Sequence, residues 1–256
     1  MIKRLKINQD SLEEDAYRYM VKWHQLLQER KYEDSKQLCL KYTTGCKLVL
    51  KKYPWGEENQ DYNKVLILAI LFRGLQDFTY LEKIQNDKEW YKDTQKVEYT
   101  WIIMLDCKDR IEFVRDKLLY KNKLIEIVLD KISSLKMFFI EKFGDGKYLS
   151  PDILRKKSIC NICNNDIRSC HHVAGRLYNG VICYSVPSDD VLITSVSTVK
   201  VPQDPRCRIW SWQIIGNEVK DACVLTSFAI DDFLRERDEK VGIFCSLSIK
   251  NIEVFE

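Results

Sequence analysis

Three cysteines and a histidine lie within thirteen residues, at spacings typical of a metal site. Cys160 and Cys163 form a CxxC pair, which lets two thiolates bind one ion from a tight turn, and Cys170 and His172 follow closely. A Cys-x-His pair places both side chains on one side of an extended backbone, whereas adjacent side chains point apart. We therefore predict that Cys160, Cys163, Cys170 and His172 bind one Zn²⁺ in a tetrahedral structural site that leaves no open position for water.

Other interpretations of these cysteines remain open. His171 or Cys183 can replace one of the predicted ligands. A redox-active CxxC is a second interpretation, but the strand–CxxC–helix context of thioredoxin-like proteins is missing. Buried cysteines that bind nothing are a third, and they fit poorly beside the polar residues Asn161, Asn164, Asn165 and Asp166. Cysteines elsewhere occur singly, and we expect them to be small buried apolar side chains in a reducing compartment: Cys39, Cys46, Cys107, Cys207, Cys223 and Cys245.

The cysteine segment also resembles a known kind of cassette. It is similar to a small zinc cassette of uncharacterised bacterial and phage-associated proteins, including some phage prohead-protease-like chains, through the pattern Cys160-x2-Cys163-x6-Cys170-x-His172-x2-Gly175-x2-Tyr178-x-Gly180. A β segment and a Pro-x-x-Pro turn at residues 202–205 follow in both, so the resemblance covers about 50 of the 256 residues. It implies zinc binding and a microbial setting, with a role in phage biology or phage defence by analogy. Protease activity does not carry over, because no catalytic Ser/His pair can be matched.

Few residues are available for catalysis, because the chain has only three histidines, at positions 24, 171 and 172. Walker A, GxGxxG, GxSxG and HExxH motifs are absent from the sequence, as are the HxE and PCxxC of zinc deaminases. His171-His172 with Asn179 is similar to the order in HNH nucleases, but no further metal-binding residue on a following helix is evident. We predict a non-enzymatic protein.

The distribution of prolines divides the chain into two parts, and both must position the metal site. No proline occurs between Trp55 and Ser150, and four of the five prolines lie beyond that stretch. We predict an α+β fold, with an N-terminal helical bundle at residues 1–150 and a zinc-stabilised β-rich module at residues 151–256. Apolar periodicity predicts helices at about residues 10–26, 33–51, 61–81, 88–120 and 123–143.

The second part has the patterns of strands. β-branched and aromatic residues predict strands at residues 191–201 and 208–215. Near the end, an amphipathic pattern predicts a helix at residues 228–239, and alternation predicts a half-buried strand at residues 243–250.

Charge and hydropathy patterns bear on partners and location. The net charge of +3 neither supports nor excludes nucleic acid. Residues 1–10 lack the apolar stretch of a secretory signal, and the longest apolar run, residues 65–72, is too short to cross a bilayer. We expect a cytoplasmic, zinc-binding interaction or adaptor protein with a protein partner and no membrane association. Alternatives are a nuclease with an unrecognised site, or a nucleic-acid-binding protein that uses basic and aromatic residues near the zinc: Arg155, Lys156, Lys157, Arg168, Arg176, Arg206, Arg208, Tyr178, Trp210 and Trp212.

Overall fold

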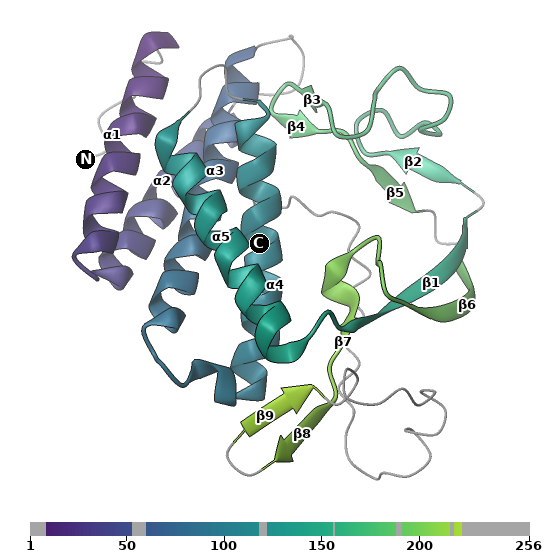
Figure 1. Cartoon of the computed structure of the whole chain (residues 1–256). Helices are drawn as coiled ribbons and strands as arrows, with labels where there is room; N and C mark the ends of the chain where they lie inside the picture. The colour runs from purple at the N-terminus through teal and green to yellow at the C-terminus, as the bar shows by residue number, and fades with distance from the viewer. Residues whose placement is uncertain are drawn as a thin grey trace.

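The computed structural model describes residues 9–52, 60–117, 122–155, 157–187, 191–215 and 218–221. It has the predicted α+β fold, with helices in the first part of the chain and short strands after them (Figure 1). The helices are α1 Gln9–Gln28, α2 Tyr32–Lys52, α3 Gln60–Gln85, the 3₁₀ turn η1 Trp90–Lys92, α4 Thr94–Arg115 and α5 Lys123–Phe143.

Capping side chains explain where α4 and α5 begin, and a glycine explains where α5 ends. The predicted helical stretch 88–120 is divided in the structure, because the Asp93 side chain accepts a hydrogen bond from the backbone N–H of Lys96 (3.2 Å) and starts α4 there. Asn122 caps α5 in the same way, by accepting from the N–H of Leu124 (2.9 Å). Gly144 ends α5 with a φ of 71°, a value that favours glycine. The predicted bounds of α5 are therefore confirmed.

Helix α3 forms the centre of the bundle. All residues from 65 to 72 are buried, and α3 packs against both α2 and α4. A helix that is apolar on all sides belongs in an interior, so the longest apolar run of the sequence is a core helix. Within the described residues, no helix combines the length and apolar character that crossing a membrane requires.

Strands follow the bundle as small antiparallel units. Their bounds are β1 Lys147–Arg155, β2 Ser158–Cys160, β3 Leu177–Tyr178, β4 Val181–Ile182, β5 Ser185–Pro187, β6 Val191–Val199, β7 Arg208–Ile209, β8 Trp212–Ile215 and β9 Glu218–Asp221, with a 3₁₀ turn η2 at Pro205–Cys207. The three-stranded sheet has the order β6-β1-β7, and the other pairs are β2-β5, β3-β4 and β8-β9. The strand predicted at 191–201 is confirmed, whereas the one predicted at 208–215 is divided into β7 and β8. The helix and strand predicted at 228–239 and 243–250 lie outside the described residues.

Aromatic side chains pack the strand-rich part against the helical bundle. Trp210 is buried in the same core as the helices and stacks on Trp212 with ring centroids 4.9 Å apart. The indole N–H of Trp101, on α4, donates to the carbonyl of Pro205 (2.9 Å). Residues on both sides of position 150 thus share one core, while the division into two domains at that position stays a prediction.

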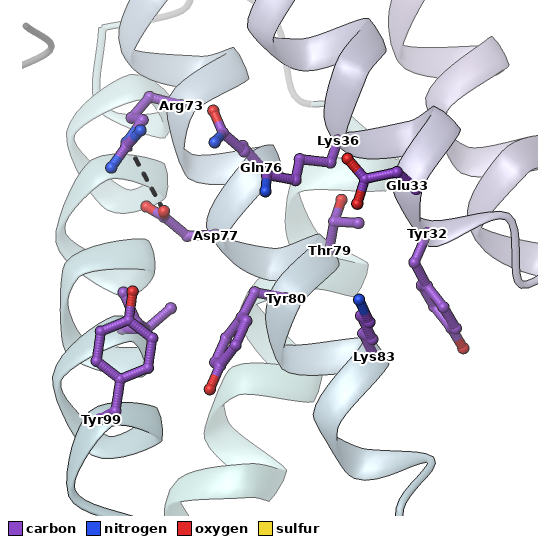
Figure 2. A pocket seen from close by; sticks show the side chains of 11 residues that line it. Tyr32, Glu33, Lys36, Arg73, Gln76, Asp77, Thr79, Tyr80, Lys83 and Tyr99 are labelled. Atoms are coloured by element: carbon purple, nitrogen blue, oxygen red, sulfur yellow. Dashed lines mark ion pairs between the residues drawn. The ribbon is translucent and has the colours of Figure 1, made fainter. Parts of the chain in front are cut away.

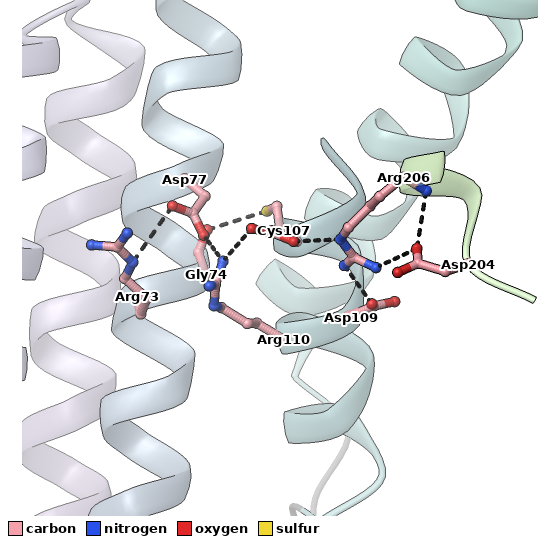
Figure 3. A network of polar contacts seen from close by, with 9 residues as sticks. Arg73, Gly74, Asp77, Cys107, Asp109, Arg110, Asp204 and Arg206 are labelled. Carbon is pink, nitrogen blue, oxygen red and sulfur yellow. Dashed lines mark hydrogen bonds and ion pairs between the residues drawn. The ribbon is translucent and has the colours of Figure 1, made fainter. Parts of the chain in front are cut away.

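An ion-pair network forms a second attachment (Figure 3). Arg206, on η2, donates to Asp106 (2.7 Å) and Asp109 (2.6 Å) of α4 and also to Asp204. Asp106 also lies 3.7 Å from Arg110, whose guanidinium donates to the buried Asp77 of α3. The strand-rich part therefore contacts α4 through both apolar and charged groups.

Candidate metal centre

The predicted metal ligands lie beyond two successive antiparallel strand pairs, β1-β6 and β2-β5. Strands β1 and β6 pair as far as Arg155↔Val191, and the neighbouring strands of the chain, β2 and β5, form a separate antiparallel pair as far as Cys160↔Ser185 (Figure 1). We call these four strands the ribbon. Residues 161–184 connect β2 to β5 and form the ribbon's closed end, which we call the cassette. Three of the four predicted ligands lie inside it, and Cys160 lies at its base.

A tight turn shapes the first half of the site. The carbonyl of Cys160 accepts from the N–H of Asn164 (2.9 Å), and the Cys160 N–H donates to the carbonyl of Asn165 (2.8 Å). Asn164 adopts a φ of 57°, a left-handed conformation that asparagine tolerates better than most residues. The N–H of Ile162 points at Cys160 Sγ (3.4 Å). A sulfur held by backbone donors in a tight turn is well placed to act as a thiolate.

The structure brings the four predicted ligands together. One ligand atom from each of Cys160, Cys163, Cys170 and His172 lies within 4.8 Å of all the others, so the group can hold a metal ion. With Zn–S bonds of about 2.3 Å, sulfurs of a tetrahedral site are about 3.8 Å apart, so only a small contraction is needed.

The surroundings of His172 also fit a metal ligand. Its Nδ1 is buried and has no hydrogen-bond partner within the described residues, which is costly for an imidazole nitrogen unless a ligand satisfies it. The ring lies edge-on to Tyr178, with centroids 4.8 Å apart, and the Tyr178 hydroxyl accepts from the N–H of Val173 (3.0 Å). Tyr178 therefore fixes both the imidazole and the backbone beside it.

The thiols of Cys160 and Cys170 ionise with different ease, because their surroundings shift their pKa values in opposite directions. Burial by itself would raise the pKa of Cys160, but the backbone N–H groups of Cys163 and Ile162 lower it to about 7. Burial raises the pKa of Cys170, and the neighbouring thiols Cys160 and Cys163 raise it further. A divalent cation would offset this mutual repulsion and allow all the thiols to ionise.

The two alternative ligands, His171 and Cys183, differ in burial and in their distance from the cluster. His171 is exposed and does not belong to the cluster. Cys183 is buried, and its Sγ lies 3.9 Å from Cys160 Sγ, although it is not one of the four clustered residues. Burial and the contact with Cys160 raise the pKa of Cys183 to about 11. Among the single cysteines, Cys39, Cys46, Cys107 and Cys207 are buried as expected, whereas Cys223 and Cys245 lie outside the described residues.

A β-hairpin attaches the cassette to the helical bundle. Strands β3 and β4 are joined by Asn179 and Gly180, whose φ values of 49° and 75° fit a type I′ turn. The N–H of Gly180 donates to the Asn63 side chain on α3 (2.7 Å), and Leu177 and Ile182 pack against the helical core. This attachment was not predicted from the sequence, although an Asn-Gly pair between apolar residues is a strong hairpin signal.

Several of the residues considered for nucleic-acid binding are not available at the surface. Arg208 and Trp210 are buried, and Arg206 is occupied by three aspartates. Arg168 is exposed but forms a bidentate pair with Asp166 (2.9 and 2.6 Å). Sequence alone could not show this, because most partners of Arg206 and Arg208 lie 60 to 100 residues away.

Comparison with known proteins finds no matching family model, no similar curated protein and no similar solved structure.

Proposed function

We propose that this protein is a zinc-binding, non-enzymatic adaptor whose cassette holds the end of a ribbon that recognises a protein partner. The Cys₃His cluster carries this proposal. Thiolate and imidazole ligands suit Zn²⁺, whereas Mg²⁺ and Ca²⁺ prefer oxygen ligands. Four protein ligands fill a tetrahedral zinc site, so the ion would have a structural role and would not activate water.

The ribbon next to the cassette supplies a surface for a partner. Strand β6 is at the edge of the described three-stranded sheet, and residues 192–198 are all exposed. Large apolar side chains are among them: Leu192 is 61% exposed and Val196 56%, and Leu154 of β1 is 62% exposed. A long apolar edge strand is a template for pairing with another chain, and strand addition is a common mode of peptide recognition.

The phage-related or phage-defence setting is part of the same proposal and rests on the resemblance of the cassette alone. A nucleic-acid-binding role, or a nuclease with an unrecognised site, is the alternative. One experiment separates the adaptor from these alternatives. It isolates the protein from its own host and identifies whether the bound partner is protein or nucleic acid.

The test begins with the full chain purified from its own host. Native mass spectrometry and elemental analysis should find one zinc per chain and a protein partner in fixed proportion. Leu192→Lys with Val196→Lys should release the partner while retaining zinc, because the two lysines add charge to the ribbon and leave the ligands intact. Leu48→Lys is the matched control, since Leu48 is also 56% exposed but lies on α2.

Several outcomes would count against the proposal. Protein without zinc would remove the metal site, and bound nucleic acid in place of a protein would favour the alternative. A partner retained equally by the ribbon variant and the Leu48→Lys control would show that the ribbon is not the binding surface.

A further inference from the structure

Strands β1 and β6 of the ribbon carry apolar side chains on one face. Successive residues of a strand point to opposite faces, and residues directly across from each other share a face. The register of β1 and β6 therefore places three cross-strand pairs together, which we call the apolar face: Leu149↔Thr198, Pro151↔Val196 and Ile153↔Ile193. No charged side chain is among them, and Ile193 is 49% exposed and Val196 56%.

The opposite face of the same strands turns toward the helices at its base. Tyr148 is buried in the helical core, and Val199, its partner on β6, packs against that core. The Ser195 hydroxyl donates to Asp152 (2.5 Å) on this same face. Its central pairs are polar: Ser150↔Ser197 and Asp152↔Ser195. Antiparallel strands usually turn their apolar side inward and their polar side to water, so these two strands have the reverse arrangement.

The apolar face lacks a covering layer within the described part of the chain. Strand β7 pairs with β1 only at Lys147 and Tyr148, so the described strands beyond them are two, β1 and β6. Leu149 and Ile153 are partly exposed and are not among the described residues that pack against the helical core. Two strands alone are marginally stable in water, and an apolar face is normally buried against another layer. A second molecule can supply that layer.

The pocket of the helical bundle is a different kind of surface. It has a volume of about 210 Å³ and is lined by side chains of α2, α3 and α4, most of them polar or charged (Figure 2). Glu33 lies near Lys36, which helps to lower its pKa, and Arg73 Nε lies 3.8 Å from Asp77. Charge in the pocket is therefore offset within the protein.

A second copy of this chain fits the apolar face in twist, charge and shape. Two copies of the same strand pair have the same twist, so they can pack with their strands nearly aligned, as in β-sandwiches. Neither copy brings a charge into the contact, so no like charges meet. A two-fold axis at the central Pro151↔Val196 pair would place the bulky isoleucine pair of one copy over the smaller Leu149↔Thr198 pair of the other.

We propose that the apolar face packs on the same face of a second copy of this chain and forms a two-fold symmetric dimer. This contact goes beyond the adaptor role, because it uses side chains on one face and leaves the backbone edge of β6 open for the adaptor's partner. The dimer would present two such edges and two cassettes. A partner with repeated binding segments would then be held at both edges, which raises its apparent affinity without any new contact.

The test is sedimentation equilibrium of the zinc-loaded full chain in the absence of any partner. The wild type should have the mass of two chains. Ile153→Lys with Ile193→Lys should weaken the dimer by about hundredfold or more, because each lysine occurs twice in a two-fold interface and brings like charges together. Ile153→Thr with Ile193→Thr retains β-branched side chains that suit strands, and the loss of apolar area should weaken the dimer by about tenfold.

Leu154→Lys with Leu192→Lys is the matched control. These two residues are the next cross-strand pair along the same strands, are 62% and 61% exposed, and lie on the opposite face. Their substitution should leave the dimer intact, and equal zinc content and thermal midpoints would show that all variants are folded. A monomeric wild type, or equal effects of the lysine pairs on the two faces, would overturn the proposal. A monomeric wild type that still binds another protein in its host would refute the dimer and retain the adaptor role.

Discussion

Arg208 allows the sharpest test of how the strand-rich part is attached to the helices. Its side chain is 1% exposed, and Nη2 donates to the carbonyls of Phe143 (2.9 Å) and Gly144 (3.1 Å) at the end of α5. The guanidinium also lies over the ring of Trp210, 4.1 Å from the centroid. We expect Arg208→Met to lower the free energy of unfolding, because methionine fills part of the same space but donates no hydrogen bond.

The magnitude follows from these contacts. Two hydrogen bonds from a charged donor contribute about 1.5–3 kcal/mol each, and a cation at a helix C-terminus contributes up to about 2 kcal/mol in a partly buried site. A desolvated cation–π contact adds about 2 kcal/mol. Against these gains, burial of the charge costs several kcal/mol, a cost that methionine does not have. The net loss should be about 3 kcal/mol, and Arg208→Lys should recover part of it.

Urea unfolding followed by tryptophan fluorescence measures this loss, because Trp101 and Trp210 lie beside the guanidinium. Arg115→Met is the control. The Arg115 side chain is 43% exposed and, among the described residues, pairs only with its exposed neighbour Asp116, so its removal should change stability by less than about 1 kcal/mol. Equal stability of the two methionine variants would refute the structural role of Arg208. It would also restore Arg208 as a candidate for surface recognition.

Three further changes test the metal site and its attachment. Cys170→Ser should abolish stoichiometric zinc and lower the thermal midpoint of the strand-rich part, because structural zinc contributes to folding directly; unchanged metal content would contradict this. His172→Ala should lose zinc while His171→Ala retains it, as elemental analysis would show, and equal loss would refute the ligand choice. Gly180→Ala should destabilise the chain by about 1–3 kcal/mol more than Gly175→Ala in urea unfolding. Both glycines have positive φ (75° and 82°), but only at Gly180 would the added Cβ lie 2.8 Å from a side chain of α2, so equal effects would argue against the hairpin contact.

Local patterns in the sequence predicted local features well. The bounds of α5 follow from one apolar stripe and a terminal glycine, and the four clustered ligands follow from spacing within thirteen residues. Asn164 directly follows the CxxC pair, and its φ of 57° is a left-handed conformation that asparagine tolerates in tight turns. Each of these features depends on neighbours a few residues apart, which is the range over which sequence patterns carry information.

Features that depend on distant residues were not predictable. Arg206 is surrounded by aspartates of α4 about 100 residues earlier, so its basic character suggested an exposed surface. The pocket combines residues from three helices, and no motif marks it. The division between η1 and α4 is an intermediate case, because Asp93 is a recognisable cap, but the apolar periodicity continues across it.

The burial pattern of the cassette gives a reason for a structural metal that is independent of ligand spacing. Among residues 161–184, only Gly180 and Cys183 are buried, and the apolar Leu177 and Ile182 are only partly covered where the hairpin meets the bundle. Ordering each residue costs about 1–2 kcal/mol of backbone entropy, and a segment with so little buried apolar surface has few contacts to offset that cost. The hairpin fixes one end of the cassette on α3, but the turn at Cys160 and the loop that carries Cys170 lie away from this contact. A bound ion would join those two parts through its ligands, which is how small zinc modules fold without a hydrophobic core of their own.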